Sequence, residues 1–158
     1  MVHSTPSFPV NALLRLITFA ALVSCSHATA PVDFSGTWRM NFLDMTMGSL
    51  VCDVEAMDVV ITRSGDAFTG TQTGITVRRC THNNSTITSD VTGVTVVEGQ
   101  IDGSHITFSL GSIPGSAVVA PNSVDATLSG STISGTAIWP DNTGGMTVSG
   151  TFSATKLQ

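Results

Sequence analysis

Hydrophobic and polar residues alternate along residues 34–42. One face of an extended chain here would carry Phe34, Gly36, Trp38, Met40 and Phe42. Ser35, Thr37, Arg39 and Asn41 would lie on the other face. This period of two predicts a β-strand with one apolar face. We expect the rest of the chain to supply the strands that bury this face.

The same alternation continues to the C-terminus, and no long run of apolar residues at helical spacing follows the N-terminus. Turn sequences separate the alternating segments, including 64–66, 102–103 and 129–131. The chain is therefore predicted to be all-β, with about eight antiparallel strands in an up-and-down meander that closes into a small barrel.

Two segments depart from simple alternation. In residues 51–61 the apolar positions change from one face to the other, which predicts a β-bulge near Glu55. Residues 87–101 form either one long strand or two strands broken near Gly93.

A four-residue motif recurs in the predicted strands: a large apolar residue, a hydroxyl residue, glycine and threonine. Its copies begin at Phe34, Phe68, Ile133 and Val148, with a looser copy at Val97. Glycine inside a strand often marks a bend or a close approach of two backbones. Bends at matching heights would let the sheet curl and close. The alternative is a strand composition that is simply rich in glycine and threonine.

The motif Gly36-Thr37-Trp38 resembles the G-x-W signature of the lipocalin and avidin group of barrels, which are calycin-like. In that group the tryptophan closes one end of the barrel, and a basic residue near the end of the last strand packs across it. The resemblance implies that Trp38 and Lys156 are this barrel-closing pair. The chain has no tyrosine, so the tyrosine ligand of a biotin site has no counterpart.

The N-terminus has the pattern of an export signal. Arg15 precedes the apolar run 16–23, which is shorter than the roughly 20 residues that span a bilayer and is typical of a signal peptide. The end of this run, Leu22-Val23-Ser24-Cys25, resembles a bacterial lipobox, whose cysteine is lipidated and becomes the new N-terminus. The alternative is ordinary cleavage after Ala30, which would give a secreted protein.

The lipobox resemblance divides the chain into a lipoprotein signal peptide (1–24), a lipidated N-terminus and tether (25–33) and a β-barrel domain (34–158). Ser26 is not an acidic retention signal, which implies the outer membrane in an organism that has one. We therefore expect a location in the cell envelope, lipid-anchored at the outer membrane or the periplasmic face.

The cysteine count predicts one covalent bond, and the net charge limits the partners that we expect. If Cys25 carries lipid, Cys52 and Cys80 remain as an even pair, which in an exported protein predicts a disulfide. The formal charge is −5, with 6 basic and 11 acidic side chains, so we expect no nucleic-acid partner.

No catalytic arrangement stands out, and we predict a protein that is not an enzyme and uses no metal or cofactor. Asp53, Glu55 and Asp58 are close in sequence, but a solvated strand edge explains them better than acid–base chemistry. His82 lies close to Cys80, but no fourth residue has the spacing of a metal ligand.

Two functions remain open. One is a structural or protein-interaction module of the cell envelope with a filled interior, which we favour because the inward positions are rich in bulky side chains. The alternative is lipocalin-like binding of a small apolar molecule or lipid inside the barrel. The residues expected to line such a site are Trp38, Met40, Phe42, Phe108, Trp139 and Phe152. We expect no ionisable side chain and no amide among the inward positions.

Overall fold

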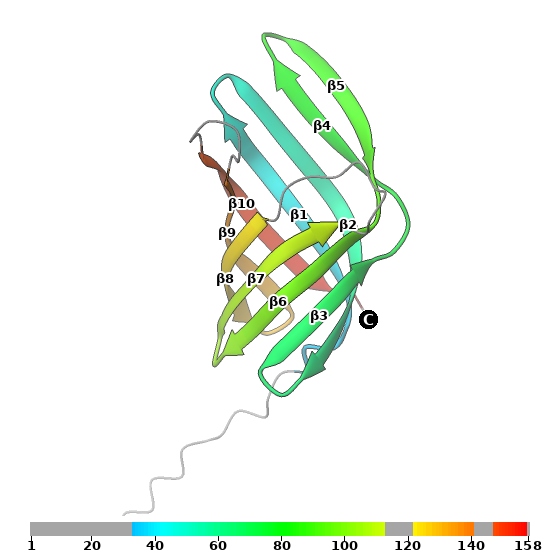
Figure 1. The fold of residues 1–158 in the computed structure, drawn as a ribbon, viewed down its shortest axis with the longest axis vertical. Coiled ribbons are helices and arrows are strands. Elements are labelled where there is room, and N and C mark those ends of the chain that lie inside the picture. The colour runs from blue at the N-terminus through cyan, green and yellow to red at the C-terminus, as the bar shows by residue number, and fades with distance from the viewer. Residues whose placement is uncertain (1–32, 113–121, 141–146, 158) are drawn as a thin grey trace, which may run out of the picture. The chain divides into compact units, whose positions relative to one another are not determined.

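The computed structural model describes residues 33–112, 122–140 and 147–157, and these contain ten β-strands and no helix (Figure 1). Cys25 and the predicted signal peptide lie outside the described residues. Trp139 is described for its backbone only. The strands are β1 (Gly36–Met47), β2 (Leu50–Ser64), β3 (Ala67–Gln72), β4 (Thr76–His82), β5 (Ser85–Val91), β6 (Val94–Asp102), β7 (His105–Ser112), β8 (Asn122–Ser129), β9 (Thr132–Pro140) and β10 (Thr147–Lys156).

Eight of the strands close into a barrel in which every pairing is antiparallel. Their order is β1-β10-β9-β8-β7-β6-β3-β2, and β2 pairs back onto β1. The remaining strands, β4 and β5, lie outside this ring as a hairpin attached to β2. The predicted all-β meander and its closure are confirmed, and the architecture is compatible with a calycin-like fold.

Two long strands of the meander bend midway, and each is divided between the barrel and the hairpin. One consists of β3 followed by β4, and the other of β5 followed by β6. β3 and β4 pair with successive parts of β2, at residues 59–64 and 51–54. The second bent strand lies alongside the first, because β6 pairs with β3 and β5 pairs with β4. The halves β3 and β6 complete the barrel. The halves β4 and β5 form a hairpin, residues 76–91, that we call the extension. Figure 1 shows it projecting past the barrel strands, and the predicted break near Gly93 separates β5 from β6.

The two bends, at residues 73–75 and 92–93, interrupt the backbone hydrogen-bond ladder, and side chains replace part of it. Gln72 is only 8% exposed; its Nε2 donates to the carbonyl of Val91 (2.8 Å), and its Oε1 accepts from the amide of Val94 (3.1 Å). The hydroxyl of Thr76 donates to the carbonyl of Glu55 (2.6 Å). Buried backbone polar groups need such partners. We call Gln72, Thr76, Val91 and Val94 the joint.

Gln72 also corrects our expectation that no amide points inward. It follows Phe68 and Gly70 at a spacing of two, so the alternation of the strand places it on the buried face. The amide is tolerated there because both of its polar atoms have backbone partners.

The predicted bulge in β2 is confirmed at Glu55 and Ala56. Ala56 has a positive φ of 54°, and its amide donates to Oδ1 of Asn41 on β1 (2.9 Å). The extra residue shifts the register between Phe42 and Met40 on β1 and restores an inward position for Met57. The apolar pattern therefore changes parity without exposing the core.

Four of the five recurring glycines stand where neighbouring strands approach closely, and the fifth, Gly36, has a positive φ of 124°. A Cβ at Gly150 would lie 2.5 Å from the carbonyl oxygen of Leu43 and 2.5 Å from Sδ of Met45. A Cβ at Gly70 would lie 2.8 Å from Cδ1 of Ile61. A side chain at either position would force its neighbours apart, which explains why the motif carries glycine at this step.

Candidate functional site

The barrel interior contains a continuous chain of aromatic rings. Neighbouring ring centroids are 4.7–5.9 Å apart, within the range for favourable edge-to-face or tilted contact. In order of contact the rings are Trp38, Phe34, Phe68, Phe108, Phe152 and Phe42. They come from β1, β3, β7 and β10, together with the residues just before β1. The rings therefore join strands from around the whole barrel.

The positions that we expected to line a ligand site belong to this core. Trp38, Met40, Phe42, Phe108 and Phe152 are all buried. Four of these five residues are members of the aromatic chain, so their inner surfaces contact other rings. The sixth expected residue, Trp139, is described in its backbone alone.

The end of the barrel where β1 begins is covered by the residues that precede it. Phe34 packs on both Trp38 and Phe68, and the indole Nε1 of Trp38 donates to the carbonyl of Phe34 (2.9 Å). Trp38 is fully buried. Phe34, the first aromatic residue that the structure describes, therefore lies over this end of the barrel.

Lys156 lies directly opposite Trp38 in the register of β1 and β10. Its ammonium donates to the carbonyl (2.5 Å) and to Oδ2 (3.3 Å) of Asp33, and its stem passes beside Gly36. The structure thus brings the two residues of the expected closing pair together. A contact between the ammonium and the indole ring stays a prediction.

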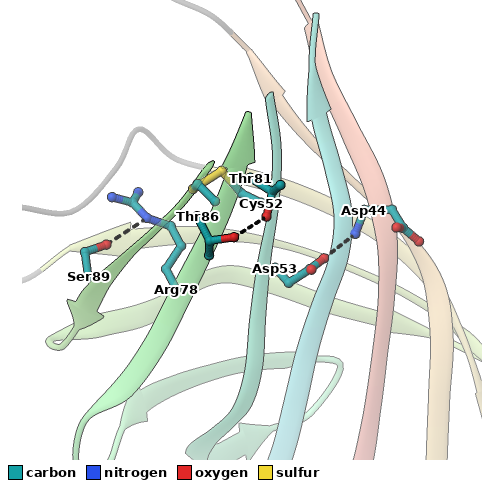
Figure 2. The surroundings of a disulfide bond; sticks show 8 residues. Asp44, Cys52, Asp53, Arg78, Thr81, Thr86 and Ser89 are labelled. Carbon is teal, nitrogen blue, oxygen red and sulfur yellow. Dashed lines mark hydrogen bonds between the residues drawn. A yellow bond between two sulfur atoms is a disulfide. The ribbon is translucent and has the colours of Figure 1, made fainter. Parts of the chain in front are cut away.

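The extension is fastened to β2 by a disulfide. Cys52 on β2 and Cys80 on β4 face each other directly in the register, with an S–S distance of 2.08 Å (Figure 2). Within the hairpin, the hydroxyls of Thr81 and Thr86 are 3.2 Å apart, and Nε of Arg78 donates to Oγ of Ser89 (3.1 Å). The predicted Cys52–Cys80 bond is confirmed.

Exposed apolar side chains gather on and beside the extension. In the part of the chain whose side chains are described, four of the six exposed large apolar residues lie here: Met47, Ile75, Val77 and Ile87. Ile87 on β5 is 70% exposed and lies directly opposite Cys80. Because Met45, Cys52, Cys80 and Ile87 are successive cross-strand partners, this row runs on one face from the buried core to solvent.

The carboxylates near the bulge have structural partners. Oδ1 of Asp53 accepts the backbone amide of Asp44 (2.8 Å), and Glu55 lies 3.7 Å from Arg79. Arg39 holds both oxygens of Asp58, at 2.8 and 2.9 Å. The hydrogen bonds from Arg39 lower the pKa of Asp58, against a smaller opposing effect of burial. A carboxylate held ionised in this way is suited to an ion pair rather than to proton transfer.

The described residues contain no cluster of three or more His, Cys, Asp or Glu side chains arranged to hold a metal ion. Over the same ranges, no helix is long and apolar enough to cross a membrane. Comparison of the chain with protein-family models, with curated proteins and with solved structures returns no match. The class that the fold itself defines is a small antiparallel β-barrel with an attached two-stranded extension.

Sequence reasoning missed the extension as a separate part of the molecule. The sequence marks each bend only by a glycine, Gly74 and Gly93, and in the structure both glycines have positive φ. The segments on both sides of each bend alternate normally. Only the pairing of β2 with both β3 and β4 shows that the halves β4 and β5 leave the barrel.

Proposed function

We propose that this chain is an exported, lipid-anchored β-barrel that acts as a non-enzymatic protein-interaction module of the cell envelope. The observation that carries the proposal is the contrast between a barrel whose interior holds a chain of contacting rings and an extension that presents apolar side chains to solvent. In this proposal the barrel is a scaffold and the extension is the part that meets a partner.

The packing of the interior supports a scaffold rather than a ligand carrier. An eight-stranded barrel is just wide enough to be filled by side chains or to hold one small ligand. Phe68, Phe108 and Phe152 come from three different strands and contact one another in sequence. Each ring contact of this kind leaves less of the interior for an apolar ligand, which supports the scaffold role.

The sequence and the disulfide support export. Leu22-Val23-Ser24-Cys25 supplies the lipobox-like motif, and disulfides persist in oxidising compartments outside the cytosol. The Cys52–Cys80 bond fastens a hairpin in which few residues are buried. A lipid on Cys25 would keep the module at a membrane surface, with the tether up to residue 33 as a spacer.

The interior is tested by extracting the purified protein with organic solvent and analysing the extract by mass spectrometry. We expect less than one bound lipid or other apolar molecule per chain. Titration with an apolar fluorescent probe should likewise show no stoichiometric site. One extracted ligand per chain would overturn the proposal and favour lipocalin-like binding.

The anchor is tested by intact-mass analysis of the protein isolated from a membrane fraction. We expect a chain that begins at Cys25 and carries acyl groups, and a soluble or unprocessed chain for Cys25→Ser. Ser26→Ala is the matched control and should be anchored normally. An unmodified mature chain beginning at Pro31 would contradict the proposal.

A further inference from the structure

Among the described strands, β5 is an edge strand, because it pairs with β4 and with no other. Proteins usually protect such edges with lysine, proline, bulges or a covering segment, since unpaired backbone groups attract other strands. Residues 85–89 contain no charged residue and no proline. The middle of the strand carries Ile87, which is 70% exposed. The edge is therefore well suited to accept another strand.

The register shows which backbone groups point outward. Cys52 and Cys80 lie opposite each other with a Cα–Cα distance of 4.0 Å, as in a non-hydrogen-bonded antiparallel pair. The N–H and C=O of Cys80 thus point toward β5, where they meet Ile87. It follows that Thr86, Thr88 and Asp90 direct their N–H and C=O groups to the open edge.

A second observation agrees with this assignment. The carbonyl of Val91 accepts from Gln72, a residue of β3, on the same side of the strand as β4. The odd-numbered residues of β5 therefore face β4, and the even-numbered residues face outward.

We propose that β5 pairs antiparallel with β5 of a second copy of this chain, about a twofold axis at Ile87. The pairing joins the two extensions into one continuous sheet. The inference rests on the proposed function, because it names the partner of the extension. Isologous pairing of identical antiparallel strands is a natural way to form a twofold dimer.

The residues of β5 are complementary to themselves in this register. Ile87 faces Ile87 of the second copy in a non-hydrogen-bonded pair, where side chains come closest. Thr86 faces Thr88 of the second copy, and both have outward backbone groups that form the new ladder. The remaining pair within β5 is Ser85 with Ser89, so no like charges oppose each other across the register.

A register centred on Thr88 would satisfy the backbone equally well, but it would place Ile87 opposite Ser89. The Ile87 register buries more apolar surface and is favoured for that reason. The edge is short, so the interface is smaller than in standard stable complexes and the dissociation constant should lie roughly in the micromolar range.

The test is sedimentation velocity on the full chain carrying Cys25→Ser, which removes the lipid-accepting thiol. We expect a monomer–dimer equilibrium between about 1 and 500 µM. Ile87→Lys should raise the dissociation constant at least about tenfold, because two ammonium groups would face each other. Ile75→Lys is the matched control, since Ile75 is equally exposed but lies in the β3–β4 connection. A monomer at every concentration, or equal effects of the two substitutions, would overturn the proposal.

Mixing charge variants tests the register. Ile87→Lys and Ile87→Glu should each associate more weakly than the parent, and an equimolar mixture should associate more tightly than either variant alone. Failure of the mixture to do so would contradict pairing of Ile87 with its own copy. Circular dichroism of each variant checks that the barrel remains folded.

The outcomes separate this inference from the proposed function. A stoichiometric ligand in the barrel would overturn the interaction-module proposal whether or not the chain dimerises. A monomeric protein with no bound ligand would overturn β5 pairing and leave the interaction-module proposal standing.

Discussion

The barrel and the extension are made from the same meander, yet they are held together by different interactions. Each barrel strand has a neighbour on both sides and contributes buried apolar side chains to the core. The extension has two strands, one of them at an edge, and most of their side chains are at least partly exposed. Its attachment includes four register pairs with β2, one disulfide, the exposed Glu55–Arg79 ion pair and the joint. Stability within one sheet therefore falls from the barrel to the tip of the extension.

The largest expected effect comes from removing a ring of the aromatic chain. Trp38→Ala should lower the free energy of unfolding by ~3–5 kcal/mol, because it removes a buried indole and leaves a cavity. Ile87→Ala on the extension is the contrasting variant and should change it by less than about 0.5 kcal/mol, because Ile87 is exposed. Denaturant unfolding followed by circular dichroism measures both. Similar losses for the two variants would contradict the division into a packed barrel and a loosely held extension.

Removing the disulfide should have the next largest effect. The Cys52→Ala/Cys80→Ala double variant should lose about 3–4 kcal/mol in the chain-entropy model for a separation of 28 residues. The loss should be concentrated in the extension, where amide exchange should accelerate before that of β7 to β10. Thiol labelling of the unfolded, unreduced protein is the control. Two free thiols from Cys52 and Cys80 would show that the bond is absent.

The hydrogen bonds of the joint should contribute less to the free energy of unfolding than the disulfide does, but more than any surface residue. Gln72→Leu removes the partners of the Val91 carbonyl and the Val94 amide, which should cost about 2–3 kcal/mol. Gln100→Leu is matched in chemistry but lies on an exposed position of β6 and should change stability little. Thermal unfolding of both variants tests this difference. A Gln72→Leu protein as stable as the parent would mean that these hydrogen bonds do not hold the two regions together.

The smallest effect is expected at the Arg39–Asp58 ion pair on the barrel surface. The hydrogen bonds from Arg39 lower the pKa of Asp58 below its ordinary value of 3.8. The pair therefore stabilises the folded state at pH values above 3.8, and this contribution is lost as the pH falls through the lowered folded pKa. Melting temperatures of the parent and Asp58→Asn should differ slightly at neutral pH and converge in acid. In an Arg39→Gln background the same substitution should have no effect of this kind.

Much of the barrel could be predicted from the sequence because alternation directly reports which side chains face the core. Trp38, Met40 and Phe42 lie where alternation places them, and the parity change at Glu55 is resolved by a bulge. The disulfide also followed from the number of cysteines that remain when Cys25 is set aside as the expected lipidation site. These predictions depend on local patterns, or on a count, and not on the three-dimensional pairing.

The extension and the joint could not be predicted because they depend on which strands share an edge. Residues 76–91 alternate like barrel strands, and nothing local distinguishes the part of β2 that pairs with β4 from the part that pairs with β3. Gln72 was overlooked for a related reason. An amide is tolerated on a buried face only where two bends leave backbone groups unpaired, and sequence alternation does not show where those groups meet.

Residue-resolved amide hydrogen exchange at low and high protein concentration tests the central contrast most directly. We expect slow exchange of amides in the barrel strands β7 to β10 at both concentrations. The outward amides of Thr86 and Thr88 should exchange quickly in dilute solution and slow down as the concentration rises. The amides of Ile87 and Ser89, which face β4, should be protected at both concentrations. Barrel amides that exchange as fast as those of Thr86 and Thr88, or outward amides unaffected by concentration, would contradict the account of a packed barrel that associates through its extension.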